Sequence, residues 1–386
     1  MTLLRSGRTV ALAAVIAALL VGGTWFALTR ASAQPRTGKD AAAHPAAQHP
    51  AGSRRPVTLM SVTPAAHARQ VDGAAAIRFV FSQPLAPDSP LPTLSPSIAG
   101  TWRASGNSIE FVPRLGFPQL THVKLVIPGG PSGVRSADGG LLAARVVDGF
   151  WTGTYSTLRV EQLLAQLGYL PLSWQPVPGD PPVPTADANA QLSAAYSPPL
   201  GSFTWQPGYP LELRNFWRAG QPSLILGGAV MAFESDRGLN MDGTVGPAVW
   251  QALLKAVAKG ENNPNGYTYA LASKASPETL KIWHDGRLVL KTLANTGIPA
   301  RPTVDGTFPV YLRYRFQIMK GTNPDGSKYA DPVSFVSYFN GGDAVHYYPR
   351  ATFGWPQSLG CVELPYTQAQ QAWPFLTYGS LVSVVG

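Results

Sequence analysis

Cys361, the single cysteine of the chain, and His346, fifteen residues before it, are residue types that can carry out nucleophilic chemistry together. A thiol accepts an acyl group only as thiolate, so a catalytic cysteine needs a nearby imidazole or positive field and amide N–H groups for the developing oxyanion. Gly360 would allow close backbone approach beside the nucleophile. Spacing alone also fits a buried structural thiol or an intermolecular link, so all three readings stay open at this point.

Other chemistries find less support in the sequence. No HExxH motif and no clustered Cys/His spacing predicts a metal site, and no GxxxxGK[ST] loop predicts phosphate binding. We therefore expect neither a metal nor another cofactor. His284 falls in a predicted hairpin turn, where we expect it to be solvated.

The net charge of +9 comes from basic residues that are scattered along the chain. A scattered charge argues against a nucleic-acid-binding arm. It would favour loose association with an anionic polymer such as the cell envelope, although ordinary solubilising charge explains it equally well.

The N-terminal segment, residues 1–30, has the pattern of a membrane anchor or export signal. Arg5 and Arg8 precede an almost uninterrupted apolar run from Val10 to Leu28. The sequence Ala31-Ser32-Ala33-Gln34 has the small-x-small form of a cleavage site. Because the run is longer than a usual signal-peptide core, we expect a retained anchor, with the rest of the chain outside the cytoplasm or in the cell wall.

We interpret the chain as a multidomain α+β protein. Residues 31–56 lack large apolar side chains and are expected to be a flexible linker. In residues 57–150, apolar residues alternate in short runs, as in Ile77, Phe79 and Phe81, which predicts a small β-sandwich. The succession IRFVFSQPL, GTWRASGNSIEFVPR and THVKLVIPGG resembles bacterial Ig-like domains of surface proteins, which implies a spacer role.

Residues 151–262 are expected to form a small helical domain. Val160, Leu163, Leu164 and Leu167 stand at offsets of one helix face, and a second such stripe begins at Trp250. The sequence GGAVMAFESDRGLNMDGTVGPAVWQALL resembles the second half of the peptidoglycan-binding repeat, which implies binding to glycan.

A Pro-rich insertion, residues 171–220, departs from that repeat. Its aromatic residues would either extend a glycan-binding surface or pack against a neighbouring domain; they are Trp205, Tyr209, Phe216 and Trp217.

Residues 266–386 are predicted to be mostly β-structure. His284-Asp285-Gly286 separates two apolar runs, the pattern of a hairpin with an Asp-Gly turn. Further strands are predicted at 307–312, 334–339 and 381–385, and one helix at 367–376, so Cys361 lies just before that helix.

The segment DAVHYYPRATFGWPQSLGCVELPY resembles the active-site region of YkuD-type L,D-transpeptidases, in which a His is followed by Ser/Thr-His-Gly-Cys. His346 matches the base, and Ser358, Gly360 and Cys361 match the final motif. The upstream sequence TLANTGIPARPTVDGTFPVYLR resembles the strand-turn segment of the same family. The resemblance implies that Cys361 is the nucleophile and that backbone N–H groups near Leu359 and Gly360 stabilise the oxyanion.

Two residues depart from the family pattern. Leu359 replaces the motif histidine, and Glu363 stands where the family generally has Asn or Arg. An unpaired Glu363 close to the thiol would raise the pKa of Cys361; alternatively, Glu363 recognises an amine of the acceptor peptide. Glu363 and Tyr347 are the expected substrate-binding residues.

The activity implied by the resemblance is 3→3 cross-linking of peptidoglycan stem peptides, with release of D-alanine through a thioester. The expected partners are stem peptides, glycan and, through residues 1–30, the cell membrane; nucleic acid is not expected. Alternatives are an L,D-carboxypeptidase and an inactive wall-binding protein. A papain-type peptidase would need a Cys-Gly-Ser-Cys-Trp signature, which the sequence lacks.

Overall fold

The protein is described by a computed structural model that covers residues 54–114, 116–180 and 182–386. The predicted anchor at 1–30 and nearly all of the predicted linker at 31–56 lie outside these residues. Among the helices that the structure does describe, none combines the length and the apolar character needed to span a membrane.

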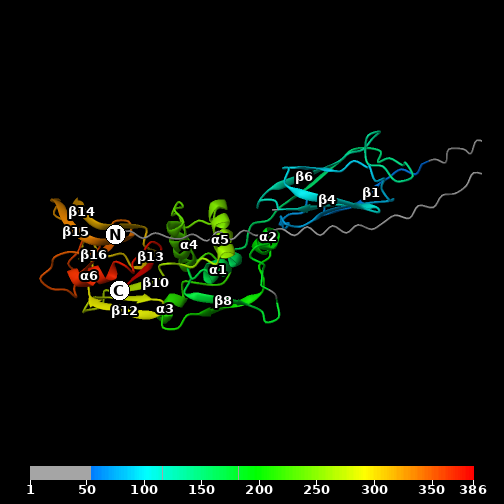
Figure 1. Ribbon diagram of the computed structural model, residues 1–386. Coiled ribbons are helices and arrows are strands. Elements are labelled where there is room, and N and C mark those ends of the chain that lie inside the picture. The colour runs from blue at the N-terminus through cyan, green and yellow to red at the C-terminus, as the bar shows by residue number, and fades with distance from the viewer. Residues whose placement is uncertain (1–53, 115, 181) are drawn as a thin grey trace, which may run out of the picture. The chain divides into compact units, whose positions relative to one another are not determined.

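The N-terminal described region contains two antiparallel sheets (Figure 1). Ile77, Phe79 and Phe81 are buried while Arg78 between them is exposed, the alternation of a strand with one face on a core. One sheet has the order β1-β2-β5-β4 and the other β3-β6-β7. The strands are β1 Leu59–Thr63, β2 Ile77–Phe81, β3 Thr93–Ser95, β4 Gly100–Ser105, β5 Ser108–Pro113, β6 His122–Ile127 and β7 Val146–Trp151.

These two sheets enclose one core. The buried cluster takes Ile77 and Phe79 from the first sheet and Val123 and Phe150 from the second. Two sheets that share one apolar core form a β-sandwich. Its classification as Ig-like stays a prediction.

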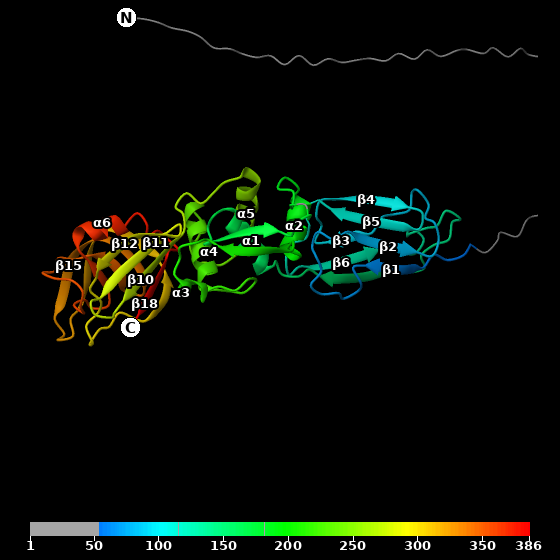
Figure 2. The same cartoon turned by 90° about the horizontal axis from the view of Figure 1, so that it is seen from below.

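A helical region follows, with α1 Thr157–Gln166, α2 Ala188–Tyr196, α3 Leu211–Arg214, α4 Leu224–Asp236 and α5 Pro247–Lys259. Both predicted stripes face its core, since Leu163 and Leu164 of α1 and Leu253 of α5 are buried together. Figures 1 and 2 show α1, α4 and α5 gathered in the green part of the ribbon.

Local sequence sets the ends of these helices. The Ser223 hydroxyl accepts a hydrogen bond from the Leu226 amide and begins α4. Gly260, in the left-handed region at φ 63°, ends α5.

The insertion at 171–220 is structured and joins the helical core. It contains α2, α3 and the antiparallel pair β8 Leu172–Pro176 and β9 Gly201–Trp205. Tyr209 is buried in the helical core, and Trp205, Phe216 and Trp217 pack against it half-buried. These aromatics therefore pack on the helical core, and the role in glycan binding stays a prediction.

The C-terminal region contains a five-stranded sheet in the order β12-β11-β10-β18-β13. The predicted hairpin connects β11 and β12, and Asp285 and Gly286 both have positive φ at its turn. These strands are β10 Thr268–Ser273, β11 Thr279–His284, β12 Arg287–Leu293, β13 Gly306–Pro309 and β18 Leu381–Val385.

A second sheet in the order β14-β15-β16-β17 carries the residues of the motif. Its first two strands form a long hairpin, visible in Figure 1, of which the sequence predicted only the 334–339 portion. The strands are β14 Leu312–Thr322, β15 Lys328–Asn340, β16 Asp343–Tyr347 and β17 Val362–Leu364. The predicted helix at 367–376 is shorter than expected, since α6 spans Tyr366–Ala372. The catalytic-domain candidate is therefore mostly β-structure, as predicted.

Candidate active site

Parallel pairing of β16 with β17 places the motif residues on one face. His346 pairs with Glu363, and Cys361 lies two residues before Glu363. Because side chains alternate between the faces of a strand, residues 361 and 363 point to the same side as His346. Strand register thus places a thiol and an imidazole that are fifteen residues apart in the chain on one face of the sheet.

Both side chains line one cleft of about 680 Å³. The β14–β15 hairpin supplies one wall, with Met319, Tyr329, Asp331 and Tyr338 among its lining residues. The neighbouring strands β16 and β17 of the same sheet and the residues beside them supply the other lining residues: Asp343, His346, Tyr348, Arg350, Gln357, Ser358, Leu359, Cys361 and Glu363. A polar cleft of this size beside a thiol can hold a peptide segment.

Cys361 is buried, and its thiol donates a hydrogen bond to the Gly342 carbonyl, with Sγ 3.7 Å from the oxygen. Burial raises the pKa of Cys361 to about 12; the Ala344 amide opposes this shift, and the Asp343 and Glu363 carboxylates add to it. The thiol is therefore neutral in the unliganded protein at neutral pH.

His346 is also buried, with only 2% of its surface exposed. Its Nδ1 lies 3.0 Å from the Tyr347 carbonyl oxygen. Since a carbonyl can only accept, Nδ1 carries the proton and Nε2 is free to act as a base. Burial lowers the pKa of His346, so its neutral, basic form is favoured.

Ser358 holds the turn that presents the nucleophile. Its hydroxyl donates to the Cys361 carbonyl, with Oγ 2.5 Å from the oxygen, and accepts from the Gly360 amide at 3.2 Å. Both capacities of the buried hydroxyl are used within the turn, so Ser358 has a structural role there. The Gly360 amide is committed to Ser358, which leaves the Leu359 and Cys361 amides as candidate oxyanion donors.

Gly360 meets two requirements of this turn. Its φ is 121°, which side chains rarely adopt. A methyl group on its Cα would lie 2.3 Å from Asp343 Oδ1. The Asp343 carboxylate therefore sits directly against the backbone beside the nucleophile.

A loop before β13 supports the Ser358 turn. The Thr296 carbonyl accepts from the Gln357 and Ser358 amides at 2.8 and 2.9 Å. Thr296 is held by Glu278, whose carboxylate accepts from the Thr296 amide at 2.6 Å and hydroxyl at 2.7 Å. Sequence reasoning missed Glu278, because nothing in its local sequence marks it as a support residue.

Glu363 is paired, not free. Arg350 donates from Nε to Oε2 at 2.7 Å and from Nη2 to Oε1 at 2.8 Å. The same Nη2 also donates to the Gln357 carbonyl at 2.9 Å. The hydrogen bonds with Glu363 raise the pKa of Arg350. Arg350 was not identified from the sequence, although an unusual acid at 363 is a signal to look for a compensating base.

Two expectations for single residues need correction. Tyr347 does not line the cleft; it packs edge to face against Tyr366 at a centroid distance of 5.1 Å, and Tyr348 lines the cleft instead. His284 is half-buried rather than solvated, with Nδ1 3.0 Å from Thr268 Oγ1 and its ring against Phe375. Leu359 is half-buried and lines the cleft.

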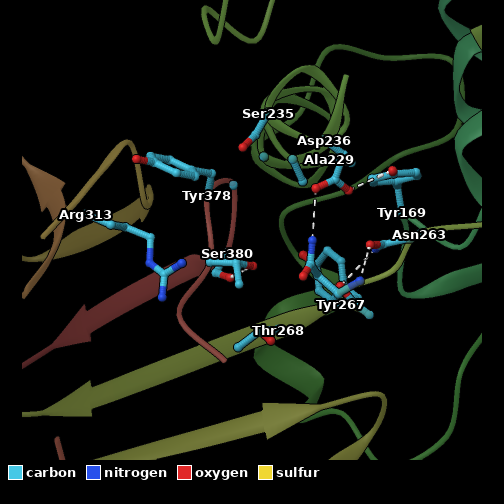
Figure 3. A pocket seen from close by; sticks show the side chains of 16 residues that line it. Tyr169, Ala229, Ser235, Asp236, Asn263, Tyr267, Thr268, Arg313, Tyr378 and Ser380 are labelled. Carbon is cyan, nitrogen blue, oxygen red and sulfur yellow. Dashed lines mark hydrogen bonds between the residues drawn. The ribbon is translucent and has the colours of Figure 1, made fainter. Parts of the chain in front are cut away.

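A second cavity, of about 160 Å³, lies between the end of α4 and the turn before β18 (Figure 3). Tyr169 donates to Asp236 Oδ2 at 2.8 Å, and Asn265 Nδ2 donates to Asp236 Oδ1 at 2.9 Å. The residues described as lining it include no cysteine or histidine, so it lacks the nucleophile and base of the first cleft.

In residues 54–114, 116–180 and 182–386, no group of three or more His, Cys, Asp or Glu side chains is placed to hold a metal ion. The first cleft is lined by the Cys361 thiol, the His346 imidazole and charged side chains around them.

Several solved structures resemble the chain. An L,D-transpeptidase from Mycobacterium smegmatis is 15% identical, with 86% of this chain and 100% of that chain covered and a TM-score of 0.29. L,D-transpeptidase 3 from Mycobacterium tuberculosis is 15% identical over 85% and 98% of the two chains, with a TM-score of 0.29. The catalytic domain of the Enterococcus faecium L,D-transpeptidase is 26% identical over 31% of this chain and 96% of its own, also with a TM-score of 0.29.

No curated protein matches the chain. The family model of the YkuD L,D-transpeptidase catalytic domain matches residues 267–384, which include both sheets of the C-terminal region and the cleft with Cys361 and His346. The chain thus carries, at residues 267–384, a catalytic domain of the YkuD L,D-transpeptidase family.

Proposed function

We propose that the protein is an L,D-transpeptidase that forms 3→3 peptidoglycan cross-links, with Cys361 as the nucleophile and His346 as its base. The observation that carries this proposal is that the thiol and the imidazole line one cleft on the same face of β16 and β17. The family match at 267–384 supplies the reaction class.

In the first step, the Cys361 sulfur attacks the carbonyl carbon of the third residue of a tetrapeptide stem, in the amide bond to the terminal D-alanine. His346 Nε2 takes the thiol proton and gives it to the nitrogen of the leaving D-alanine. The C–N bond breaks, a thioester forms, and His346 is neutral again.

Because the resting thiol and imidazole are both neutral, proton transfer accompanies attack instead of preceding it. The neutral form of His346, favoured by burial, is the form that can accept the proton. The thiol must turn from the Gly342 carbonyl toward His346 when the substrate binds, since catalytic hydrogen bonds often form only in the substrate complex.

In the second step, the side-chain amine of the diamino acid on a neighbouring stem attacks the thioester carbon. The amine loses a proton to His346, the C–S bond breaks, and the proton returns to the thiol. Water in place of the amine would make the same site an L,D-carboxypeptidase. The Leu359 and Cys361 amides stabilise the oxyanion in both steps.

The other regions fit an enzyme of the cell wall. The β-sandwich would act as an Ig-like spacer, the helical region as a peptidoglycan-binding-like module, and residues 1–30 as an anchor that keeps the catalytic domain outside the cytoplasm. Cell-wall glycan and stem peptides are the proposed partners.

Intact-protein mass spectrometry after incubation with a carbapenem tests the nucleophile. We expect one covalent adduct on the full-length protein and none on the Cys361→Ala variant. If the wild-type thiol stays unmodified and no D-alanine is released from tetrapeptides, the proposed activity is refuted and the alternative of an inactive wall-binding protein is supported.

Muropeptide analysis of purified sacculi tests the acceptor. Cross-linked 3→3 dimers support the transpeptidase, whereas tripeptides without dimers support the carboxypeptidase. The His346→Gln variant is expected to lose both products, because it removes the base but keeps a similar side-chain volume.

A further inference from the structure

The catalytic cleft is lined by three acidic and three basic side chains: Asp331, Asp343, Glu363, Arg301, Lys320 and Arg350. Among these described residues, the only ion pair joins Arg350 to Glu363. Arg301 and Lys320 are exposed at the edge, whereas Glu363 is 4% exposed. The pair is therefore the one place in the cleft where a buried charge is compensated directly.

Glu363 is the acidic side chain that lies directly opposite His346 in the strand register. It pairs with His346 across β16 and β17 and follows Cys361 by two residues on the same face. A buried carboxylate without a partner opposes the formation of a second negative charge beside it. Left alone, Glu363 would disfavour the thiolate and stabilise the proton on His346.

Arg350 is held in place on several sides. Its Nε and Nη2 donate hydrogen bonds to the two carboxylate oxygens of Glu363, and Nη2 also donates to the Gln357 carbonyl. The guanidinium lies 4.7 Å from the centre of the Tyr348 ring. This two-point geometry fixes the positive charge at Glu363 and ties it to the loop before the nucleophile.

We propose that Arg350 is a positioning residue of the active site: its guanidinium offsets part of the charge of Glu363, so that the Cys361 thiol loses its proton to His346 more readily than it would beside an unpaired carboxylate. The inference rests on the proposed function only in taking Cys361 as the nucleophile. Its electrostatic consequence can be measured on the thiol without any substrate.

Besides the pair itself, the carboxylates of Asp331 and Asp343 face the same two side chains and stay constant in the test. The carboxylates of Asp343 and Glu363 raise the pKa of Cys361. A charge on Cys361 in turn raises the pKa of Tyr329 and of Tyr338. The carboxylates of Glu363 and Asp331 raise the pKa of His346, and the Arg350 guanidinium lowers it. Changing one member of the Arg350–Glu363 pair therefore changes one charge in an otherwise fixed set.

If Arg350 offsets the charge of Glu363, the two single substitutions should change the alkylation rate of Cys361 in opposite directions. Arg350→Gln leaves Glu363 unbalanced, and the alkylation rate of Cys361 at a given pH should fall about tenfold. Glu363→Gln leaves Arg350 unbalanced, and the rate should rise above that of the wild type. The double variant Arg350→Gln/Glu363→Gln should return to within about threefold of the wild type.

The experiment measures iodoacetamide alkylation of the full-length protein by intact mass, from pH 7 to pH 10. Cys361 is the sole cysteine, so one adduct reports one site. Arg350→Lys keeps the charge and should remain within about threefold of the wild type. Arg287→Gln removes an exposed charge at the β11–β12 turn and should leave the rate unchanged.

A merely structural role for the pair gives a different pattern. In that case both single substitutions change the alkylation rate of Cys361 in the same direction. The rate of the double variant is then no closer to the wild-type rate than that of either single variant. This result would overturn the proposal. If Arg350→Gln does not fold, as judged by circular dichroism, Glu363→Gln still decides: a rate equal to or below that of the wild type contradicts the proposal.

Measuring D-alanine release alongside the alkylation rates distinguishes failure of the proposed function from failure of the role proposed for Arg350. If the wild type releases no D-alanine but the alkylation rates follow the predicted order, the role of Arg350 holds and the enzymatic assignment fails. If D-alanine release is normal and the order is absent, the function holds and the role of Arg350 fails.

Discussion

The Cys361 thiol points at the Gly342 carbonyl, with Sγ 3.7 Å from the oxygen, and makes no hydrogen bond with His346 among the described residues. A thiol that donates to a carbonyl is a protonated thiol. The unliganded site is therefore a neutral thiol beside a neutral imidazole, in contrast to a preformed thiolate–imidazolium pair.

Alkylation of the wild-type thiol should keep accelerating with pH up to at least pH 10. Burial raises the pKa of Cys361 to about 12, and below that value the thiolate fraction grows about tenfold per pH unit. Iodoacetamide kinetics by intact mass measure this, with Cys361→Ser as the unreactive control. A plateau below pH 8 would show instead that the resting protein holds a thiolate.

The same shift predicts how the thiol contributes to stability. Its native pKa lies above the ordinary value of 9, so the native state binds the proton more tightly than the unfolded state. The contribution is complete below pH 9 and is lost as the pH rises from 9 toward 12. Denaturant unfolding of the wild type and Cys361→Ala between pH 8 and pH 10.5 should show a wild-type stability that falls more steeply; parallel curves would contradict it.

Gly360→Ala should destabilise the turn and reduce acylation. The added methyl group meets Asp343 Oδ1 at 2.3 Å, and φ at this position is 121°. We expect a loss of about 1–3 kcal/mol in unfolding free energy and a carbapenem acylation rate at least about tenfold lower. Thermal unfolding and intact mass measure the two effects.

Gly326→Ala is the matched control for backbone strain. Gly326 also has a positive φ, of 88°, but nothing lies within 4 Å of an added methyl group there. It should cost about 1 kcal/mol and leave acylation unchanged. Equal acylation by the two variants would mean that the Asp343 contact does not matter.

Glu278→Gln should loosen the support of the Ser358 turn. Glu278 is 2% exposed, and its carboxylate accepts from both the amide and the hydroxyl of Thr296. An amide side chain presents a donor where two donors already point, so we expect a loss of about 2 kcal/mol in unfolding free energy and a lower kcat with little change in KM. Glu212→Gln, on the exposed surface of α3, is the control. Unchanged stability of Glu278→Gln would refute this support role.

Leu359→His should speed alkylation at pH 6, where the added side chain is partly protonated. Residue 359 lines the cleft beside the nucleophile, and a positive charge there favours the thiolate. Leu359→Gln, polar but uncharged, should leave the rate close to that of the wild type. If both variants accelerate equally, access and not charge is the cause.

The sequence determined the local structure of the protein. Alternating apolar residues predicted the strand Ile77–Phe81, a mostly apolar run predicted the strand Leu381–Val385, and two apolar stripes predicted α1 and α5. Ser358, Gly360 and Cys361 could be recognised together, because they form a contiguous segment that resembles the final motif of the YkuD-type active-site region.

Tertiary structure decided which distant residues complete the site. Arg350 and Glu278 act through contacts that strand pairing and loop packing create, and no local pattern specifies such partners. Which of the two adjacent tyrosines lines the cleft depends on the direction of its side chain. Consecutive side chains along an extended chain point to opposite faces, so Tyr347 packs against Tyr366 whereas Tyr348 lines the cleft.

The state of the thiol was likewise settled in three dimensions. Residue types at 346 and 361 define what chemistry is available, but burial, the Gly342 carbonyl and the neighbouring carboxylates set the proton affinity of Cys361. Sequence specifies short-range conformation because neighbouring residues always meet; proton affinity depends on charges and solvent exclusion that only the folded register assembles.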